Sequence, residues 1–591
     1  MATPLEPARL AFQEGVPYSE AFGDVYHSAE GGPAQARHVF LSGNGLPGRW
    51  GGRRRFTILE TGFGVGLNFL ATWQAWRRDP ARCERLHFVS VEKHPFAVSD
   101  LREIHSRYPG LAGEAAELHE RWPMLLPGAH RLELDRGRVV LTLVFADIKV
   151  LRELRLAADA IYLDGFSPAK NPDMWSSALM RALSRLAALE ATAATWSVAA
   201  SVRAALEATG FAVEKQPGFG AKREMLVARA LQGKDAPLPG ERRAAVVGAG
   251  IAGAALCERL CARGWEVELY ERHAAPAQEA SGNHAGAFHP VATPDDSVFA
   301  RLTRSGFLVS LSCWKTLERI RWDRCGLLQL ARNDREDASQ RASIAALAAP
   351  PEYAQYVTRG EASRHAGVPL AAGGLWFPQA GWIQPRSLVQ AQLEACGSRL
   401  HKRFNFELKQ IPEAAVTILA NSADAPKLCP VPQLRLRRVR GQLTLVPAER
   451  IEAPRVVCLR AGMVLPPVDG LCVVGASYDI DDDDPAPRGD SEAGNLERLE
   501  QILAQRVSSD SYEGRVAFRA VTPDRLPVAG KIADGVYGAF AYGSRGLVWA
   551  ALAAELIASE LEGEPLPLEG ALADALSPAR FARRAARRRA P

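Results

Sequence analysis

The sequence lacks a long run of apolar residues, a secretory signal pattern and any pair of cysteines in a CxxC arrangement. No window of about 18 uninterrupted apolar residues occurs, which excludes a membrane-spanning helix. Residues 1–15 alternate Pro, Glu and Arg and have no apolar segment of the kind that directs secretion. The 9 cysteines are scattered, as is typical of reduced thiols and not of disulfides or zinc sites. We therefore expect a cytoplasmic protein that binds neither a membrane nor a metal.

The sequence also has little excess of charge of one sign. It contains 72 Lys and Arg against 67 Asp and Glu, and its formal net charge is +5. Arginines are nevertheless clustered at residues 53–55, 435–440 and 580–589. Such clusters permit a polyanionic partner, but an Ala- and Arg-rich chain also uses Arg for solvation. Composition alone leaves both interpretations open.

At 591 residues the chain is too long for one hydrophobic core, so we expect two large domains. Residues 231–240 combine Gly, Pro and charge with little to bury, which is typical of a domain boundary. The predicted division is a first domain over residues 1–232, a linker over 233–241, a second domain over 242–577 and a basic tail over 578–591.

A glycine-rich turn opens the regular part of the first domain. Residues 56–60 are a short apolar strand ending in Glu60, and residues 67–76 have the pattern of a helix. Between them lie Gly62, Gly64 and Gly66, which allow the backbone to approach a ligand closely. An acid before the glycines suits the amino group and sulfonium of S-adenosylmethionine better than it suits a dinucleotide pyrophosphate.

Three further predicted strands of this domain also lead to a carboxylate. Residues 86–91 end at Glu92, where doubly wound nucleotide sites place an acid on the ribose hydroxyls. Residues 139–145 precede Asp147, a candidate for the adenine edge, and a fourth strand ends at Asp164. A single acid at such a place is more often a helix cap than a ligand, but four in register favour a binding site.

The loop that follows the fourth strand, residues 164–175, predicts the rim of a substrate cavity. Its Gly, two Pro and Asn turn the backbone out of the sheet. Asp164, Phe166 and Trp175 would then surround a flat, cationic guest. The alternative is an ordinary loop whose two aromatic side chains pack in the core.

The second domain begins with the complete dinucleotide-binding pattern. A strand at residues 243–247 leads to Gly248, Gly250 and Gly253, then to a helix, a second strand and Glu271. Gly248 would make the turn, Gly250 would admit the pyrophosphate and Gly253 would let helix and strand pack. Glu271 would bind the ribose hydroxyls. This pattern alone does not separate FAD from NAD.

Several segments carry a family resemblance. In the first half they are residues 22–26, 39–44, 60–66, 164–175 and 218–226. With these segments the first half resembles the methyltransferase half of the MnmC family, bifunctional bacterial proteins that make 5-methylaminomethyl-2-thiouridine in tRNA. In the second half, residues 280–290, 441–442 and 518–524 resemble D-amino-acid and glycine oxidases and the oxidoreductase half of the same family.

The resemblance implies a set of residues around FAD and its substrate. A late helix, preceded by a strand at residues 535–540, would return to the flavin with its positive end near the ring. Arg519 would grip a substrate carboxylate, for which a guanidinium is the right fork. His284 and His289 depart from the family pattern and receive no catalytic role. The residues expected to contact FAD here are Ser281, Gly282, Asn283, Gly543, Arg545 and Gly546.

The implied fold class is α/β, with a Rossmann-like seven-stranded methyltransferase domain followed by an FAD-binding α/β domain with an antiparallel substrate sheet. The implied function is modification of the tRNA wobble uridine in two steps. FAD-dependent removal of the carboxymethyl group from 5-carboxymethylaminomethyl-(2-thio)uridine gives the aminomethyl form, and S-adenosylmethionine-dependent N-methylation follows. Asp164 would accept the amine proton or fix the amine lone pair toward the methyl group, and Phe166 would stack on the base. The expected partner is the anticodon stem-loop of tRNA, bound by a monomer.

Two other functions remain open. One is a small-molecule amine methyltransferase fused to a glycine- or sarcosine-type oxidase. The other, of a different class, is an inactive flavoprotein that serves as an RNA-binding scaffold. The intact glycine patterns and the four strand-end acids argue against the scaffold.

Overall fold

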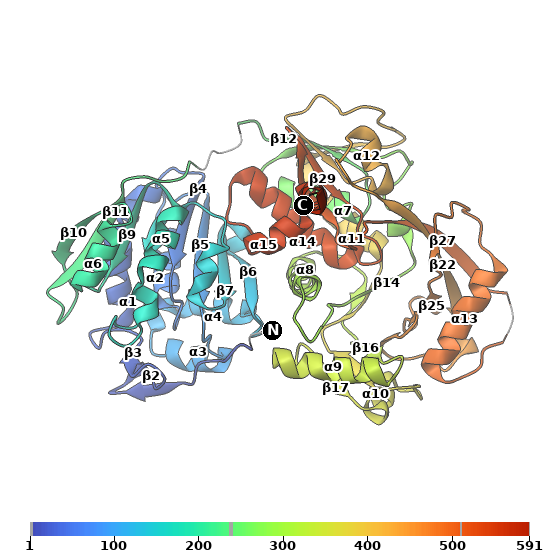
Figure 1. Cartoon of the computed structure of the whole chain (residues 1–591), viewed down its shortest axis with the longest axis horizontal. Helices are drawn as coiled ribbons and strands as arrows, with labels where there is room; N and C mark the ends of the chain where they lie inside the picture. The colour runs from blue at the N-terminus through green and yellow to red at the C-terminus, as the bar shows by residue number, and fades with distance from the viewer. Residues whose placement is uncertain (1–3, 236–239, 509–510, 590–591) are drawn as a thin grey trace. The chain divides into compact units, whose positions relative to one another are not determined.

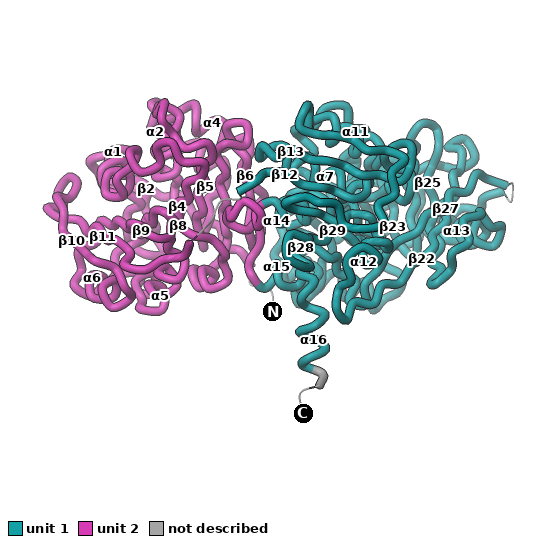
Figure 2. Tube along the Cα trace, turned by 90° about the horizontal axis from the view of Figure 1, so that it is seen from above, with its two compact units in different colours: residues 1–3, 239–558, 571–591 teal, residues 4–238, 559–570 magenta. Residues whose placement is uncertain are grey.

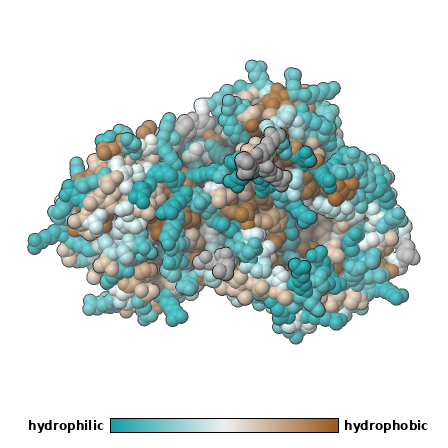
Figure 3. All heavy atoms as spheres, viewed as in Figure 1, coloured by the Kyte–Doolittle hydropathy of each residue, from teal (hydrophilic) through white to brown (hydrophobic). Residues whose placement is uncertain are grey.

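The computed structural model describes residues 4–235, 240–508 and 511–589 (Figure 1). The chain forms two compact units: unit 1 holds residues 1–3, 239–558 and 571–591, and unit 2 holds residues 4–238 and 559–570 (Figure 2). The predicted linker includes residues 236–239, which lie outside the described residues. Hydrophilic and apolar residues are interspersed on the face seen in Figure 3. Among the helices that the structure describes, none combines the length and the apolar composition that a membrane span requires.

Unit 2 is built on an eight-stranded sheet of order β10-β11-β9-β8-β4-β5-β7-β6. The central strands β9, β8, β4, β5 and β7 pair in parallel, and both edges are antiparallel. Seven strands were predicted, and β6 is the additional one. The strands in chain order are β4 (Arg55–Glu60), β5 (Arg85–Glu92), β6 (Gly128–Leu134), β7 (Val139–Phe145), β8 (Ala158–Tyr162), β9 (Ala187–Thr195), β10 (Phe211–Pro217) and β11 (Glu224–Ala230).

Alternating residues of the central strands enter two cores, one on each face of this sheet. Ile58 and Phe88 belong to one core, and Leu59 and Val89 belong to the other. Helices α2 (Leu67–Arg78), α3 (Val98–His105) and α4 (Ala112–Arg121) cover the first face, and α5 (Ser177–Leu186) and α6 (Ala200–Glu207) cover the second. A strand buried on both faces reads as a continuous apolar run, which is why β7 was found from sequence.

A lead-in precedes this sheet. It holds a three-stranded sheet of β1 (Ala11–Gln13), β2 (Val16–Ser19) and β3 (Asp24–Val25), followed by α1 (Gly32–Gln35) and a π-helix over Ala36–Leu41.

Unit 1 contains a six-stranded sheet of order β20-β13-β12-β21-β29-β28 that carries the dinucleotide pattern. Its pairs are parallel except at β28. The strands are β12 (Arg243–Val247), β13 (Glu266–Tyr270), β20 (Leu400–Arg403), β21 (Val416–Leu419), β28 (Val528–Ala533) and β29 (Val536–Phe540). Helix α7 (Ile251–Cys261) follows β12, and α14 (Gly546–Glu562) follows β29.

A second sheet of nine strands is mainly antiparallel, as predicted for the second domain. Its longest pairing joins β22 (Arg437–Pro447) to β27 (Glu513–Val521), with Val439 opposite Arg519. The other strands are β16 (Leu327–Leu330), β17 (Gln355–Val357), β18 (Gly374–Phe377), β23 (Val457–Leu459), β24 (Met463–Val464), β25 (Leu471–Gly475) and β26 (Asp479–Ile480).

The remaining elements of unit 1 surround these two sheets. A small sheet consists of β14 (Gly286–Phe288), β15 (Trp322–Asp323) and β19 (Gly381–Ile383). The helices are α8 (Val298–Trp314), α9 (Asp334–Leu347), α10 (Arg359–Ala366), α11 (Pro385–Ala395), α12 (Ala425–Leu428), α13 (Gly489–Leu503), α15 (Gly570–Leu576) and α16 (Ala579–Arg589). The α/β fold class is therefore as predicted, in both halves.

Candidate active sites

A cavity of about 870 Å³ opens at the carboxyl ends of the parallel strands of unit 2. Its lining includes Glu92, Asp147, Asp164 and Phe166. These residues are far apart in sequence, and they meet at the strand ends where the sequence pattern predicted a binding site. Glu60 is fully buried and does not line the cavity itself. This edge is where open α/β sheets bind ligands.

The predicted glycine turn forms one side of the cavity. Gly64 and Gly66 have φ of 53° and 74°, a left-handed conformation that favours glycine. The backbone N–H of Gly64 donates to Glu92 Oε2 at 2.7 Å, which holds that carboxylate at the cavity wall. A Cβ at Gly62 would lie 3.4 Å from the Asp164 carbonyl oxygen, so the turn packs closely on the loop after β8.

Two carboxylates, Glu60 and Asp164, share one amide. The Nδ2 of Asn68 donates to Glu60 Oε1 at 2.9 Å and to Asp164 Oδ2 at 2.7 Å. Burial, strengthened by the negative charge of Asp164, raises the pKa of Glu60 to about 8, against the lowering effect of a hydrogen bond from Ser90. The protonated form of Glu60 is therefore favoured at neutral pH until a cation approaches.

Asp164 has a different balance of burial and hydrogen bonds. Its Oδ1 accepts from the Gly165 N–H at 2.9 Å and from Trp196 Nε1 at 3.2 Å. Burial raises its pKa to about 6, and these donors, with Asn68 and the charge of Lys222, oppose that rise. Asp164 is thus a carboxylate at pH 7 that still accepts a proton readily, as a general base requires.

The aromatic residues of the loop after β8 divide between cavity and core. Phe166 lines the cavity, stacked on Phe22 with ring centroids 4.8 Å apart and edge-on to Tyr26 at 5.2 Å. Trp175 is buried in the core and donates its Nε1 to the Phe166 carbonyl at 2.8 Å. The core alternative for this loop therefore holds for Trp175 and not for Phe166.

Several cavity residues received no role from the sequence. Lys222 places its Nζ 3.2 Å from the centroid of the Trp196 ring, and both line the cavity. Phe22, Tyr26 and Lys222 lie in the segments that carry the family resemblance. That resemblance was the one feature of the sequence that could have indicated them as site residues. Asn68 stands two residues after the glycine turn, and only the tertiary structure shows that it reaches both carboxylates.

The dinucleotide pattern of unit 1 forms the cradle that FAD requires. A Cβ at Gly253 would lie 1.8 Å from the Gly248 carbonyl oxygen, and a Cβ at Gly250 would lie 2.9 Å from Ser281 Oγ. Only glycine lets strand, turn and helix approach this closely. Glu271 is buried and accepts from the N–H of Ala249 at 2.8 Å. The glycines, the N-terminus of α7 and the acid fit the pyrophosphate and ribose of the cofactor.

The remaining predicted FAD contacts meet in the same unit. Ser281 Oγ accepts from the Ile251 N–H at the start of α7, at 3.1 Å, and Asn283 Oδ1 accepts from Arg515 Nε at 3.2 Å. A Cβ at Gly282 would lie 2.5 Å from the Ala277 carbonyl oxygen. The segment between β29 and α14 contributes the other three residues, which are Gly543, Arg545 and Gly546.

This segment approaches both the start of α7 and a buried histidine. A Cβ at Gly546 would lie 2.5 Å from Ile251 Cδ1, and Gly543 has φ of 55°. Arg545 lies 3.3 Å from His289 Nε2 through its Nη1. Burial lowers the pKa of Arg545 to about 10 and, with the positive charge of Arg545, lowers that of His289 to about 3. His289 is therefore a neutral, buried partner of Arg545.

Arg519 of β27 lies over β22. Its Nη1 donates to the Ser477 carbonyl at 3.2 Å, and a Cβ at Gly441 would lie 2.4 Å from the same nitrogen. Burial lowers the pKa of Arg519, partly offset by Tyr478 and Asp479. A mostly buried guanidinium with this support suits a carboxylate ligand.

The comparisons with known proteins identify one domain family in each half of the chain. The family model of FAD dependent oxidoreductases matches residues 243–560, and that of S-adenosyl-L-methionine-dependent methyltransferases matches residues 109–230. The chain is thus a methyltransferase fused to an oxidoreductase, and its cofactors are S-adenosylmethionine and FAD.

Relatives over the whole length define the family. The chain is 49% identical to a tRNA 5-methylaminomethyl-2-thiouridine biosynthesis bifunctional protein MnmC from Azoarcus sp. (strain BH72), over 99% of each chain. It is 48% identical to the protein of that name from Paraburkholderia xenovorans (strain LB400), also over 99% of each chain. Glycine oxidase from Geobacillus kaustophilus aligns with a TM-score of 0.49 and 21% identity, over 57% of this chain and 98% of that one. By its relatives the chain belongs to the MnmC family.

Proposed function

We propose that the chain converts 5-carboxymethylaminomethyl-(2-thio)uridine at the tRNA wobble position to 5-methylaminomethyl-2-thiouridine. The names of its full-length relatives, which specify biosynthesis of 5-methylaminomethyl-2-thiouridine in tRNA, support this product. The observation that carries the proposal is Asp164, a carboxylate with a pKa of about 6 on the wall of a cavity that also holds Phe166. We assign methyl transfer to residues 1–232 and oxidation to residues 242–577.

The oxidative step takes place in the second half. Gly248, Gly250, Gly253 and Glu271 would hold FAD, which would supply the acceptor for a hydride from the carbon between the amine nitrogen and the carboxylate. The nitrogen gives up its proton, a C=N bond forms, and water adds to that carbon. The C–N bond then breaks, which releases glyoxylate and leaves a primary amine. Arg519 holds the carboxylate and so orients the carbon that is oxidised.

The methylation step takes place in the cavity of the first half. Asp164 accepts a hydrogen bond from the primary amine, directs its lone pair toward the donor methyl group, and takes the proton that nitrogen loses on methylation. Phe166 offers an aromatic surface to the pyrimidine ring. Gly62 and Gly64 at the turn, with Glu92 and Asp147, hold the methyl donor, and Glu60 supports them from behind.

The partner that we propose is the anticodon stem-loop of a tRNA, bound by a monomer in the cytoplasm, where tRNA is modified. The exposed arginines of the basic tail over residues 578–591 would add electrostatic attraction to phosphates, whereas Arg580 is buried and pairs with Asp524 at 3.0 Å.

A complementation experiment tests the assignment of Asp164. In cells lacking the protein, the Asp164→Asn variant should accumulate the aminomethyl uridine, because oxidation proceeds and methyl transfer falls by about 10²-fold or more. Mass analysis of tRNA nucleosides measures this. The Glu214→Gln variant, which changes an exposed carboxylate on β10, is the matched control and should give the fully methylated nucleoside. Accumulation of the carboxymethylated uridine in Asp164→Asn cells would contradict the assignment.

The two other functions predict different results with purified protein. A free amine oxidase would reduce its flavin rapidly with glycine or sarcosine, whereas the tRNA enzyme should need modified tRNA. A colourless protein without bound flavin would favour the RNA-binding scaffold.

A further inference from the structure

Arg440 belongs to one of the arginine clusters that composition linked to a polyanionic partner, yet its side chain is fully buried. It lies on β22 opposite Asp479 of β26, and its Nη1 donates to Asp479 Oδ2 at 3.0 Å. Arg438, two residues earlier on the same strand, is exposed and pairs with Asp483. The cluster therefore contains arginines with different surroundings, and Arg440 cannot contact a phosphate from this position.

Each of the three guanidinium nitrogens of Arg440 donates to at least one acceptor. The acceptors are Asp479 Oδ2, Ser491 Oγ at 3.2 Å, Gln442 Oε1 at 3.0 Å, and the carbonyl oxygens of Asp484 at 2.9 Å and Ala486 at 2.6 Å. A guanidinium has five N–H donors in a fixed plane, whereas an ammonium has three and no plane. Arg440 thereby ties residues 479–491 to β22.

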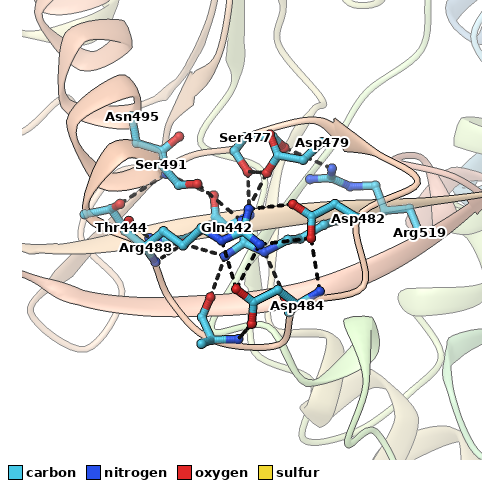
Figure 4. Close-up of polar contacts among 12 residues, drawn as sticks. Gln442, Thr444, Ser477, Asp479, Asp482, Asp484, Arg488, Ser491, Asn495 and Arg519 are labelled. Atoms are coloured by element: carbon cyan, nitrogen blue, oxygen red, sulfur yellow. Dashed lines mark hydrogen bonds and ion pairs between the residues drawn. The ribbon is translucent and has the colours of Figure 1, made fainter.

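A chain of hydrogen bonds connects Arg440 to Arg519 through Asp479 and Ser477. Ser477 Oγ donates to the Asp479 carboxylate at 2.8 Å and accepts from the Gln442 N–H at 3.1 Å. The Ser477 carbonyl accepts from Arg519 Nη1 at 3.2 Å. Figure 4 shows the Arg519 guanidinium pointing toward Ser477 and Asp479. Arg519 thus donates to a carbonyl whose position depends on the contacts of Arg440.

Gly441, between Arg440 and Gln442, packs directly against the guanidinium of Arg519. A Cβ at Gly441 would lie within 2.6 Å of three guanidinium atoms of Arg519. Consecutive residues of β22 therefore have two tasks: Arg440 fixes the loop that begins after Ser477, and Gly441 leaves room for the guanidinium.

The acidic run at residues 481–484 gives this loop its shape. Asp482 and Asp484 both pair with Arg488, at 2.5 and 2.8 Å. The loop is therefore held by ion pairs at its outer side and by Arg440 on its buried side.

We propose that Arg440 is a positioning residue for carboxylate recognition in the oxidoreductase half, acting on Arg519 through Asp479 and Ser477. The inference rests on the proposed role of Arg519. Misplacing the Arg519 fork would misalign the carbon that loses hydride, so the rate of flavin reduction falls while tRNA, bound over a much larger surface, keeps its affinity.

The test is single-turnover flavin reduction by carboxymethylaminomethyl tRNA, expressed per bound flavin. Arg440→Lys keeps the charge and loses the fork, and should slow reduction by about tenfold, as one misplaced positioning contact does. Tight tRNA binding and methyl transfer to aminomethyl tRNA should be unchanged. The matched control is Arg263→Lys, a buried arginine paired with Glu555 at 2.6 Å, which should reduce at the wild-type rate per flavin.

A double-mutant cycle separates positioning from a general structural role. In the Arg519→Lys background, Arg440→Lys should cause less than about a twofold further loss, because both act on one interaction. Losses that multiply, or a wild-type rate in Arg440→Lys, would overturn the proposal. A wild-type rate in Arg519→Lys alone would instead remove Arg519 from the proposed function.

A second variant keeps the test available if Arg440→Lys does not fold. Ser477→Ala removes the hydroxyl that joins Gln442 to Asp479 and retains the carbonyl. It should slow reduction per flavin in the same direction, with the same lack of additivity toward Arg519→Lys. Full activity of this variant would also overturn the proposal.

Discussion

At the scale of single residues, two carboxylates a few ångströms from one amide have different tasks because their surroundings differ. Glu60 is fully buried and has two neutral donors, Ser90 and Asn68. Asp164 faces the cavity and has a backbone N–H and an indole N–H besides Asn68. More donors and a nearby ammonium stabilise the Asp164 anion, so its pKa stays lower.

The pKa of Asp164 predicts the pH profile of methyl transfer. The carboxylate form is needed and the pKa is about 6, so the single-turnover rate should fall as pH decreases through 6. The loss should approach about tenfold per pH unit below that value. Asp164→Asn should lose this inflection and keep only the dependence due to the substrate amine. A wild-type profile without an inflection between pH 5 and 7 would contradict the role.

The pKa of Glu60 predicts a pH dependence of stability. Its folded pKa of about 8 lies above the ordinary 4.5, so between these values the folded state holds a proton that the unfolded state releases. Stability contributed by this group is therefore lost as pH rises, by at most about 1.4 kcal/mol per pH unit.

Glu60→Gln removes this dependence. The Tm of the variant relative to wild type, measured without ligand, should rise from pH 5 to pH 8. An equal Tm difference at both pH values would show that Glu60 is not buried with a raised pKa.

At the scale of elements, each cofactor site depends on how closely a strand, a turn and a helix approach. In unit 1, α7 can begin directly after β12 only because Gly253 has no side chain against Gly248. In unit 2, the turn before α2 packs on the loop after β8 through Gly62. The spacing of glycines in the sequence already indicated both turns.

Gly253→Ala tests this approach. A Cβ 1.8 Å from a backbone oxygen must move α7 or β12, so the variant should lose most of its flavin and about 1–3 kcal/mol of stability. Gly360→Ala is the control, since a Cβ there meets nothing within 4 Å on α10. Absorbance of bound flavin and thermal unfolding measure both variants. Normal flavin content in Gly253→Ala would contradict the packing.

At the scale of the whole molecule, each unit builds its own site from its own residues. The cavity with Asp164 belongs to unit 2, and Arg519, Arg545 and the dinucleotide cradle belong to unit 1. Some residues of the arginine clusters make contacts within the protein and are not free for a polyanion. Arg53 pairs with Asp159 at 2.8 Å, and Arg440 is buried.

Separate sites predict complementation between variants. A mixture of Asp164→Asn and Arg519→Lys proteins should convert carboxymethylaminomethyl tRNA to the methylated product, because each supplies the step that the other lacks. Either protein alone should stop at its own blocked step, with product reduced by about tenfold or more. Nucleoside mass analysis over time gives the result. Absence of product from the mixture would show that the intermediate is not exchanged between molecules.

The sequence by itself determined the α/β class, the order of the two halves, both glycine turns and the four strand-end acids. These features depend on residues close in the chain, since a strand, a turn and a helix are specified by local spacing and apolar pattern. Strand β6 was missed because only alternate residues are buried, as in an edge strand with one solvated face.

Only the tertiary structure decided which side chains meet across long separations. Asn68 reaches Asp164, Arg545 reaches His289, and Arg440 acts on Arg519 through residues 477–479, none of which is near in sequence to its partner. Such contacts depend on which strands pair and on burial, which selects one rotamer of each side chain. The apolar pattern of neighbouring residues encodes neither. The physical reason is that a buried polar group must find its partner wherever the fold brings one.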